Sequence, residues 1–130
     1  MSFAASTPWL TAAVALGGAT GSVLRWRVGL WLNPLALPFA AGTLAVNCVG
    51  GLLIGFSLVW FQRWPDELAR LALVTGLLGG LTTFSAYSAE SLQLLIRGDW
   101  LLAVGHTLAH VAGGLVCAAL GWGLGRWLLA

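Results

Sequence analysis

The chain has 130 residues, of which 59% are hydrophobic and only 8% are charged, and its mean hydropathy is +0.92. A soluble protein of this size cannot cover its surface with so few polar side chains, so we expect a membrane protein in contact with the lipid bilayer. The net charge of +2 is too thinly spread to suggest nucleic acid as a partner. Cys48 and Cys117 stand alone in apolar stretches and lack the paired spacing of a disulfide framework or a zinc site.

The apolar residues divide into four segments, each long enough to cross a bilayer, whose hydrocarbon core of roughly 30 Å needs about 20 helical residues. We place the spans at about 9–32, 38–61, 68–96 and 100–129, with turn and helix-start signals between them. Residues 1–9 hold no arginine or lysine, so we expect the first span to be retained rather than removed as a signal. The predicted fold is an all-α membrane protein in which residues 1–130 form a single four-helix transmembrane domain.

Glycines recur at a spacing of four residues in every predicted span. Such small-xxx-small pairs let helix backbones approach closely in lipid. The pairs are Gly17/Gly21, Gly51/Gly55, Gly76/Gly80 and Gly121/Gly125. We therefore expect tightly packed helices.

The arginines favour neither orientation of the chain, although the cytoplasmic side of a membrane protein normally carries an excess of positive charge. With four spans, one side carries Arg63, Arg70 and Arg126. The other side carries Arg25, Arg27 and Arg97. This equality predicts that the chain inserts both ways and pairs as an antiparallel, dual-topology homodimer. The alternative is a single orientation set by an insertion factor.

The third span contains GLLGGLTTFSAYSAES at residues 76–91, which is too rich in glycine and polar residues for a plain lipid-facing helix. Gly79-Gly80 adds conformational freedom, and Thr82-Thr83 is stiff and bonds back to carbonyls. We predict that the third helix is broken here, at mid-membrane. Such backbone must be buried in protein or line a cavity, and its freed carbonyls suit a small hard cation. The alternative is a glycine-lined helix crossing without an ion.

Thr43 and Asn47 lie four residues apart in the second span, on one face and close to mid-depth. A buried amide in lipid requires a partner or a function. An amide and a hydroxyl supply neutral donors, which can replace the hydration shell of an anion without trapping it. Phe84 and Tyr87 lie three residues apart, and the positive edges of their rings can also stabilise an anion. Aromatic residues at helical spacing are, however, more often core or lipid-facing.

Glu90 is an intramembrane carboxylate and therefore a functional candidate. Its expected partner is Arg25, near the end of the first span; the alternative is a pair on the surface. In the fourth span His106 and His110 lie four residues apart, on a face that Gly114 continues. Because a zinc site needs more ligands than these two, we interpret them as the polar wall of a pathway.

Three stretches carry a resemblance to a known family: GGATGSVLRW (17–26), GTLAVNCVGG (42–51) and VTGLLGGLTTFSAYSAE (74–90). In their order and spacing they resemble the three motifs of the Fluc (CrcB-type) fluoride channels, and the resemblance covers the whole chain. It implies a dual-topology homodimer of four-helix subunits with two parallel fluoride pores. It also implies a structural sodium ion, bound at the dimer centre by backbone carbonyls of Gly79 and Thr82.

The resemblance further implies the role of individual residues. Arg25 and Glu90 match the vestibule arginine and glutamate of the family. The fluoride pathway would comprise Thr43, Asn47, Phe84, Ser85, Tyr87, His106 and His110. Tyr87 departs from the family, which typically has phenylalanine there. His106, His110 and Gly114 stand where relatives usually have a tyrosine and two serines, so the polar track along the fourth helix differs.

The expected function is passive export of cytoplasmic fluoride through a selective channel in the inner (plasma) membrane. The chain has no phosphate-binding glycine motif and no nucleophile paired with a base, so we do not expect an enzyme. The alternative is a small proton-coupled multidrug exporter, which needs a carboxylate in its first span, where this chain has none. A structural or lysis-type membrane protein would not explain Asn47 beside a broken helix.

Overall fold

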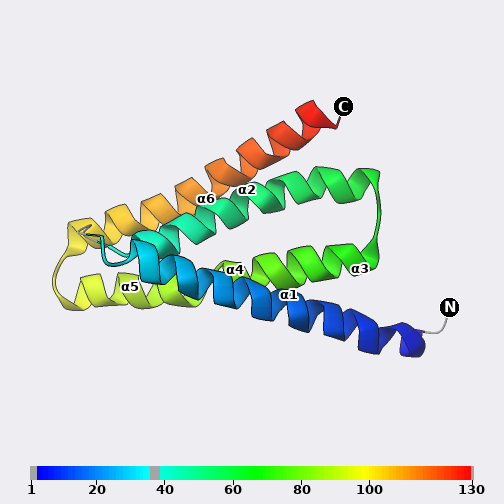
Figure 1. Cartoon of the computed structure of the whole chain (residues 1–130). Helices are drawn as coiled ribbons and strands as arrows, with labels where there is room; N and C mark the ends of the chain where they lie inside the picture. Colours follow the sequence, from blue (N-terminus) through cyan, green and yellow to red (C-terminus); the bar gives the residue numbers. More distant parts are fainter. Residues whose placement is uncertain (1–2, 36–38, 130) are drawn as a thin grey trace.

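The computed structural model describes residues 3–35 and 39–129, and all the regular elements within these ranges are helices. Figure 1 shows them in chain order: α1 (Phe3–Leu32), α2 (Ala41–Arg63), α3 (Glu67–Arg70), η1 (Leu71–Leu78), α4 (Gly79–Leu81), α5 (Phe84–Ile96) and α6 (Trp100–Leu128). The four elements from α3 to α5 occupy the third expected span. The described residues thus form four long rods, and the all-helical part of the predicted fold is confirmed.

Three of the rods are long and apolar enough to cross a membrane: Ala41–Arg63, Glu67–Ile96 and Trp100–Leu128. Helix α1 has 30 residues but is not among them. It begins at Phe3 rather than at residue 9 and includes Pro8, whose missing N–H removes only one backbone bond near the helix start. The expected start of the second span at residue 38 lies outside the described residues; α2 begins at Ala41.

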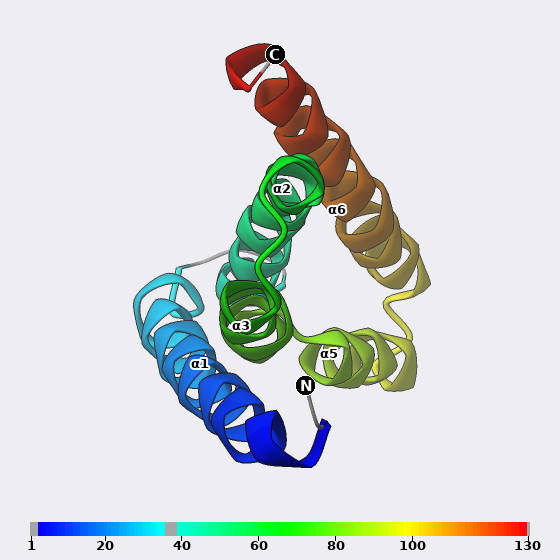
Figure 2. The same cartoon turned by 90° about the vertical axis from the view of Figure 1, so that its right-hand side faces the viewer.

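The rods pack in two close pairs, α1 along η1 and α4, and α2 along α6 (Figure 2). Glycine permits both approaches. A Cβ on Gly21 would overlap the carbonyl oxygen of Leu77, and a Cβ on Gly55 would overlap the carbonyl oxygen of Ala118. The close helix packing predicted from the glycine pairs is therefore present, and it fixes the position of the third rod against the first.

The interior of this fold is unusually polar. Val46, Leu78 and Leu81 form a small buried apolar cluster. The buried polar side chains are Thr43, Thr83, His106 and His110. Most large apolar side chains face outward instead, as expected for surfaces covered by lipid or by a second subunit. The buried polar groups therefore mark the functional candidates.

Candidate functional site

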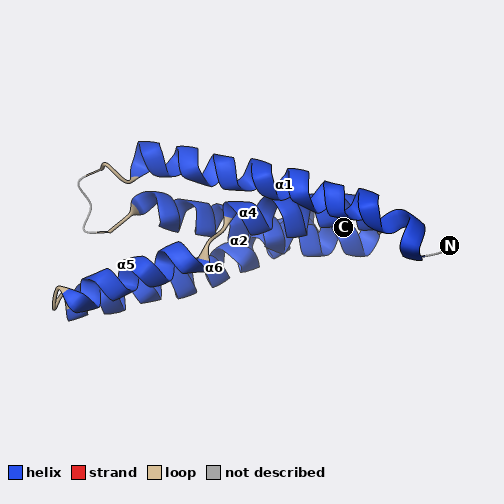
Figure 3. Ribbon diagram, turned by 90° about the horizontal axis from the view of Figure 1, so that it is seen from below, coloured by secondary structure: helices blue, strands red, loops and turns tan. Residues whose placement is uncertain are grey.

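The third rod is interrupted between α4 and α5 (Figure 3). Thr82 (φ −81°, ψ 156°) and Thr83 (φ −151°, ψ 121°) both have extended backbone, and the helix resumes at Phe84. The glycines of the predicted break, Gly79 and Gly80, remain helical. The segment before them, η1, is wound as a π-helix, a rare form that often occurs at functional sites. The interruption thus lies at the two threonines, with irregular helix before it.

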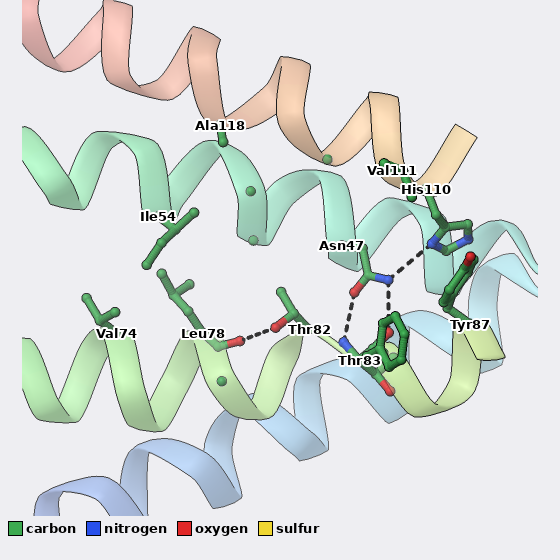
Figure 4. Close-up of a pocket in the computed structure, with 15 residues that line it drawn as sticks. Asn47, Ile54, Val74, Leu78, Thr82, Thr83, Tyr87, His110, Val111 and Ala118 are labelled. Atoms are coloured by element: carbon green, nitrogen blue, oxygen red, sulfur yellow. Dashed lines mark hydrogen bonds between the residues drawn. The ribbon is translucent and has the colours of Figure 1, made fainter. Parts of the chain in front are cut away.

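Asn47 of α2 pairs with the peptide groups of the interruption (Figure 4). Its Oδ1 accepts a hydrogen bond of 2.8 Å from the N–H of Thr83, and its Nδ2 donates one of 3.0 Å to the carbonyl of Thr83. The same Nδ2 lies 3.2 Å from Nδ1 of His110. Asn47 therefore satisfies both backbone groups of a residue that has left the helix, which is what a non-aqueous environment requires.

The hydroxyls of the two threonines stabilise the helix ends on either side. Thr83 is the N-cap of α5: its Oγ1 accepts a bond of 3.1 Å from the N–H of Ala86 and lies 3.2 Å from Oγ of Ser85. Thr82 donates from its hydroxyl to the carbonyl of Leu78, at 2.9 Å. Thr83 was not among the predicted site residues, although a threonine directly before a resumed helix is an N-cap signal.

A groove runs between α2, the interrupted rod and α6, as Figure 4 shows. Its polar end is formed by Asn47, Thr82, Thr83, Tyr87 and His110, and Phe84 also lines it. The rest of the wall is apolar or glycine. Gly79 and Thr82, the expected sodium ligands, both lie along this groove.

Glu90 of α5 is held by two buried partners. Thr43 of α2 donates from its hydroxyl to Oε1 of Glu90, and Nε2 of His106 lies 3.1 Å from Oε2. The other ring nitrogen of His106 lies 3.0 Å from Oγ of Ser91. Ser91 was missed from the sequence, where nothing distinguishes it from other helical serines.

The expected ion pair between Arg25 and Glu90 is wrong. Within the described ranges, the basic side chain in contact with Glu90 is His106, at 3.1 Å, and the contact is an ion pair when the imidazole is protonated. Thr43 and His106 contact both carboxylate oxygens, so Arg25 is not needed to satisfy their hydrogen bonding. Arg25 is half-buried and lines a second cavity, whose wall also includes Thr43, Thr83 and Glu90. Arginine and glutamate therefore share a cavity without pairing.

Thr83 lines both cavities and therefore lies between them. From the cavity of Arg25 and Glu90, polar groups lead past Thr83 to Asn47 and His110 in the groove. The series consists of a hydroxyl, an amide and an imidazole, all of which can donate hydrogen bonds. Such groups can coordinate a small anion without a fixed positive charge when they exchange their present partners for the ion.

Aromatic rings cover the histidines. Tyr87 stacks on His106 with ring centroids 5.4 Å apart and lies 4.9 Å from the ring of His110. Phe84 lies 5.4 Å from Tyr87 but is 78% exposed. The two aromatic residues thus share a face, as their spacing predicts. Ser85 is exposed and lines neither cavity, although its hydroxyl reaches Thr83.

Comparison of the sequence with known proteins identifies the family of this chain. A family model described as "CrcB-like protein, Camphor Resistance (CrcB)" matches residues 12–122. The chain belongs to the CrcB-like family. The resemblance of its three motifs to that family is therefore confirmed.

Members of the CrcB-like family from diverse bacteria align along almost the whole chain. The identity is 48% with a protein of Aromatoleum aromaticum, over 94% of both chains, and 49% with one of Thiobacillus denitrificans, over 85% of this chain and 90% of the relative. A protein of Chloroflexus aurantiacus is 45% identical, over 88% of this chain and 94% of its own length. All three relatives bear the name "Fluoride-specific ion channel FluC". The family is one of channels and not of enzymes, and its membership makes this chain a multi-pass membrane protein.

Proposed function

We propose that this chain forms a fluoride-selective channel, through which cytoplasmic fluoride leaves the cell passively across the inner membrane. The observation that carries the proposal is the series of hydrogen-bonding groups that extends from one cavity to the other through Thr83 and Asn47. The names of relatives at 45–49% identity support the choice of fluoride as the ion.

The chemistry of the groups suits a small, strongly hydrated anion. Fluoride must exchange its water for other hydrogen-bond donors, and the side chains of Thr43, Asn47 and His110 carry such donors. Thr43 donates to Glu90, and Asn47 donates to Thr83 and faces His110, so each would turn from its present partner to the ion. Neutral donors bind the ion weakly enough for it to leave again. Arg25 stands at the mouth of the path, where its charge attracts fluoride and Glu90 limits how long it stays.

The proposed pathway retains the residues expected from the sequence. Arg25 and Glu90 form the vestibule. The path then follows Thr43, Asn47, Phe84, Ser85, Tyr87, His106 and His110. Because Phe84 is largely exposed in one chain, we propose that a second subunit covers it and completes the wall. Two such paths would run side by side through the dimer.

We propose that the two subunits are antiparallel, each a single four-helix transmembrane domain, with a sodium ion between them. The equal division of the arginines supports dual insertion. In an unbroken helix the N–H of Thr83 would donate to the carbonyl of Gly79, but here it donates to Asn47. The carbonyl of Gly79 has thus lost its helical donor and suits a hard cation. The carbonyls of Gly79 and Thr82 in both subunits would bind the ion. Its positive charge would attract the two interrupted segments to each other across the dimer axis.

Purified protein in liposomes tests the proposal directly. A fluoride electrode should record efflux when a potassium gradient with valinomycin sets the membrane potential, without any proton gradient, while a chloride electrode should record none. Efflux that requires a proton gradient would favour the exporter alternative. Equal efflux of both anions would contradict selectivity.

A further inference from the structure

Glu90, His106 and His110 form a cluster of three metal-ligating side chains at the contact between α5 and α6. One potential ligand atom from each lies within 4.8 Å of the other two. His106 is 0% exposed and His110 is 8% exposed. The sequence showed two histidines and no further ligand for zinc, because the third one comes from the preceding helix. We propose that this cluster binds a divalent transition-metal ion, zinc in the first place.

The chemistry and spacing of the ligands suit zinc. Two imidazoles and a carboxylate are an established three-ligand set for Zn²⁺, which leaves a fourth position open to water or to an anion. The 3.1 Å between Nε2 of His106 and Oε2 of Glu90 is close to the roughly 3.3 Å that bonds of about 2.0–2.1 Å give between ligands of a tetrahedral ion. A rotation of the His110 side chain brings in the third ligand.

The ring of His106 is already oriented for this role. Its Nδ1 lies 3.0 Å from Oγ of Ser91, which directs Nε2 towards Glu90, and Tyr87 stacks on its face. Histidine ligands of metals characteristically use their second nitrogen for such a contact. With a metal on Nε2, the proton moves to Nδ1 and is donated to Ser91. Ser91 is therefore a positioning residue for the site.

His110 supplies the observation that points most directly to a ligand. Its Nε2 is buried and has no hydrogen-bond partner among the described residues. Because the amide nitrogen of Asn47 can only donate, Nδ1 of the neutral ring accepts and Nε2 carries the proton. A buried N–H without a partner is unfavourable, and a metal ion bound at Nε2 would displace this proton to Nδ1. Its other nitrogen faces the amide of Asn47 at 3.2 Å. Metal binding would place a proton there and lengthen this one contact, while the bonds between Asn47 and Thr83 are kept.

Metal binding has a consequence for transport that rests on the proposed function. The three ligands belong to the proposed vestibule and pathway, so a bound divalent cation would hold fluoride in its open coordination position. Zinc should therefore slow fluoride efflux. This differs from the proposed sodium site, which uses backbone carbonyls and stabilises the dimer.

The binding is tested on tag-free protein in detergent, with Co²⁺ as the spectroscopic probe and Zn²⁺ as its competitor. We expect one Co²⁺ per chain, with visible absorption bands of four-coordinate nitrogen and oxygen ligation, displaced by Zn²⁺. His110→Gln and Glu90→Gln should each weaken binding at least about tenfold. Glu67→Gln, an exposed carboxylate at the other end of the rod, is the matched control and should bind as the unaltered chain does.

Absence of the Co²⁺ bands in the unaltered chain would exclude the site. This outcome does not depend on whether any variant folds. Binding that all three variants retain equally would show surface association only. A companion measurement of fluoride efflux separates the two proposals. Stoichiometric Co²⁺ binding without any fluoride efflux contradicts the proposed function and leaves the metal site standing. Zinc binding with undiminished efflux would place the cluster outside the pathway.

Discussion

The side-chain amide of Asn47 and the peptide groups of Thr83 exchange two hydrogen bonds, of 2.8 and 3.0 Å, where α2 meets the interrupted rod. An amide carries both a donor and an acceptor, so one side chain replaces the bond that the N–H of Thr83 loses by leaving the helix and adds a second bond to its carbonyl. The same nitrogen contacts His110. Asn47 thus supports the interruption and, in the proposed function, also lies on the path of the ion.

Asn47→Asp should abolish fluoride efflux from liposomes. The carboxylate still accepts from the N–H of Thr83, but it cannot donate to the carbonyl of Thr83 or to His110. It also repels an anion at 4 Å by about 4 kcal/mol for an effective dielectric constant of 20, so we expect a loss of at least about 100-fold. The measurement is the initial rate on a fluoride electrode.

Gln62→Glu is the matched control, because it makes the same amide-to-carboxylate change on the same helix, at an exposed position near its end. It should leave the rate within about twofold, as expected for surface changes worth less than about 0.5 kcal/mol. Unchanged efflux in the Asn47 variant would remove this residue from the pathway. Equal losses in both variants would point to a general effect of charge.

The sequence predicts the rods well and the break within a few residues. Long apolar segments between turn signals define the rods, because few other structures satisfy the backbone in lipid. Of the predicted stretch from Gly79 to Thr83, only Thr82 and Thr83 leave the helix, since glycine permits a departure from the helix but does not require one. The hydrogen bonds of Asn47 hold Thr83 outside the helix, and they connect segments distant in the sequence.

The residue that contacts Glu90 could not be identified from the charge pattern of the sequence alone. Complementary charge favours Arg25, but it carries no information on distance. His106 is the actual partner, because α5 and α6 form an antiparallel hairpin in which Glu90 and His106 are equally far from Gly98. Gly98 has φ of +83°, a conformation that suits glycine at a helix end. Counting outward from such a turn would have identified the pair.

Gly50→Ala should destabilise the interruption. A Cβ at Gly50 would overlap the methyl group of Thr82, which cannot rotate away without losing the hydrogen bond from its hydroxyl to Leu78. Overpacking of this kind costs about 1–3 kcal/mol, so the thermal unfolding midpoint in detergent should fall. Gly105→Ala, where nothing lies within 4 Å of the added carbon, is the control and should be neutral or stabilising. Equal midpoints for the two variants would show that Thr82 does not depend on this space.

Thr43→Val should reduce stability by removing the hydroxyl that donates to Glu90 while keeping the shape of the side chain. Hydrogen bonds to charged groups contribute about 1.5–3 kcal/mol, and the carboxylate would keep only His106. The midpoint of thermal unfolding measures the effect. Thr20→Val provides the comparison, because its hydroxyl bonds only to a carbonyl of its own helix on an exposed face. A loss no larger than in the Thr20 variant would mean that Glu90 finds another donor.

Phe84→Ile should reduce fluoride efflux more than it reduces dimer formation. The ring is 78% exposed in one chain and contacts Tyr87, so in the proposed dimer it lies on the wall of the path rather than in a packed core. Isoleucine keeps an apolar side chain there but lacks the positive ring edge and the aromatic pair with Tyr87. Such pairs contribute about 0.5–1.5 kcal/mol, so we expect a loss of up to roughly tenfold. Phe84→Tyr keeps the ring and should retain most of the rate. Efflux on a fluoride electrode and crosslinking in the same liposomes measure the two properties separately, and parallel losses of both in the isoleucine variant would assign Phe84 to packing between subunits.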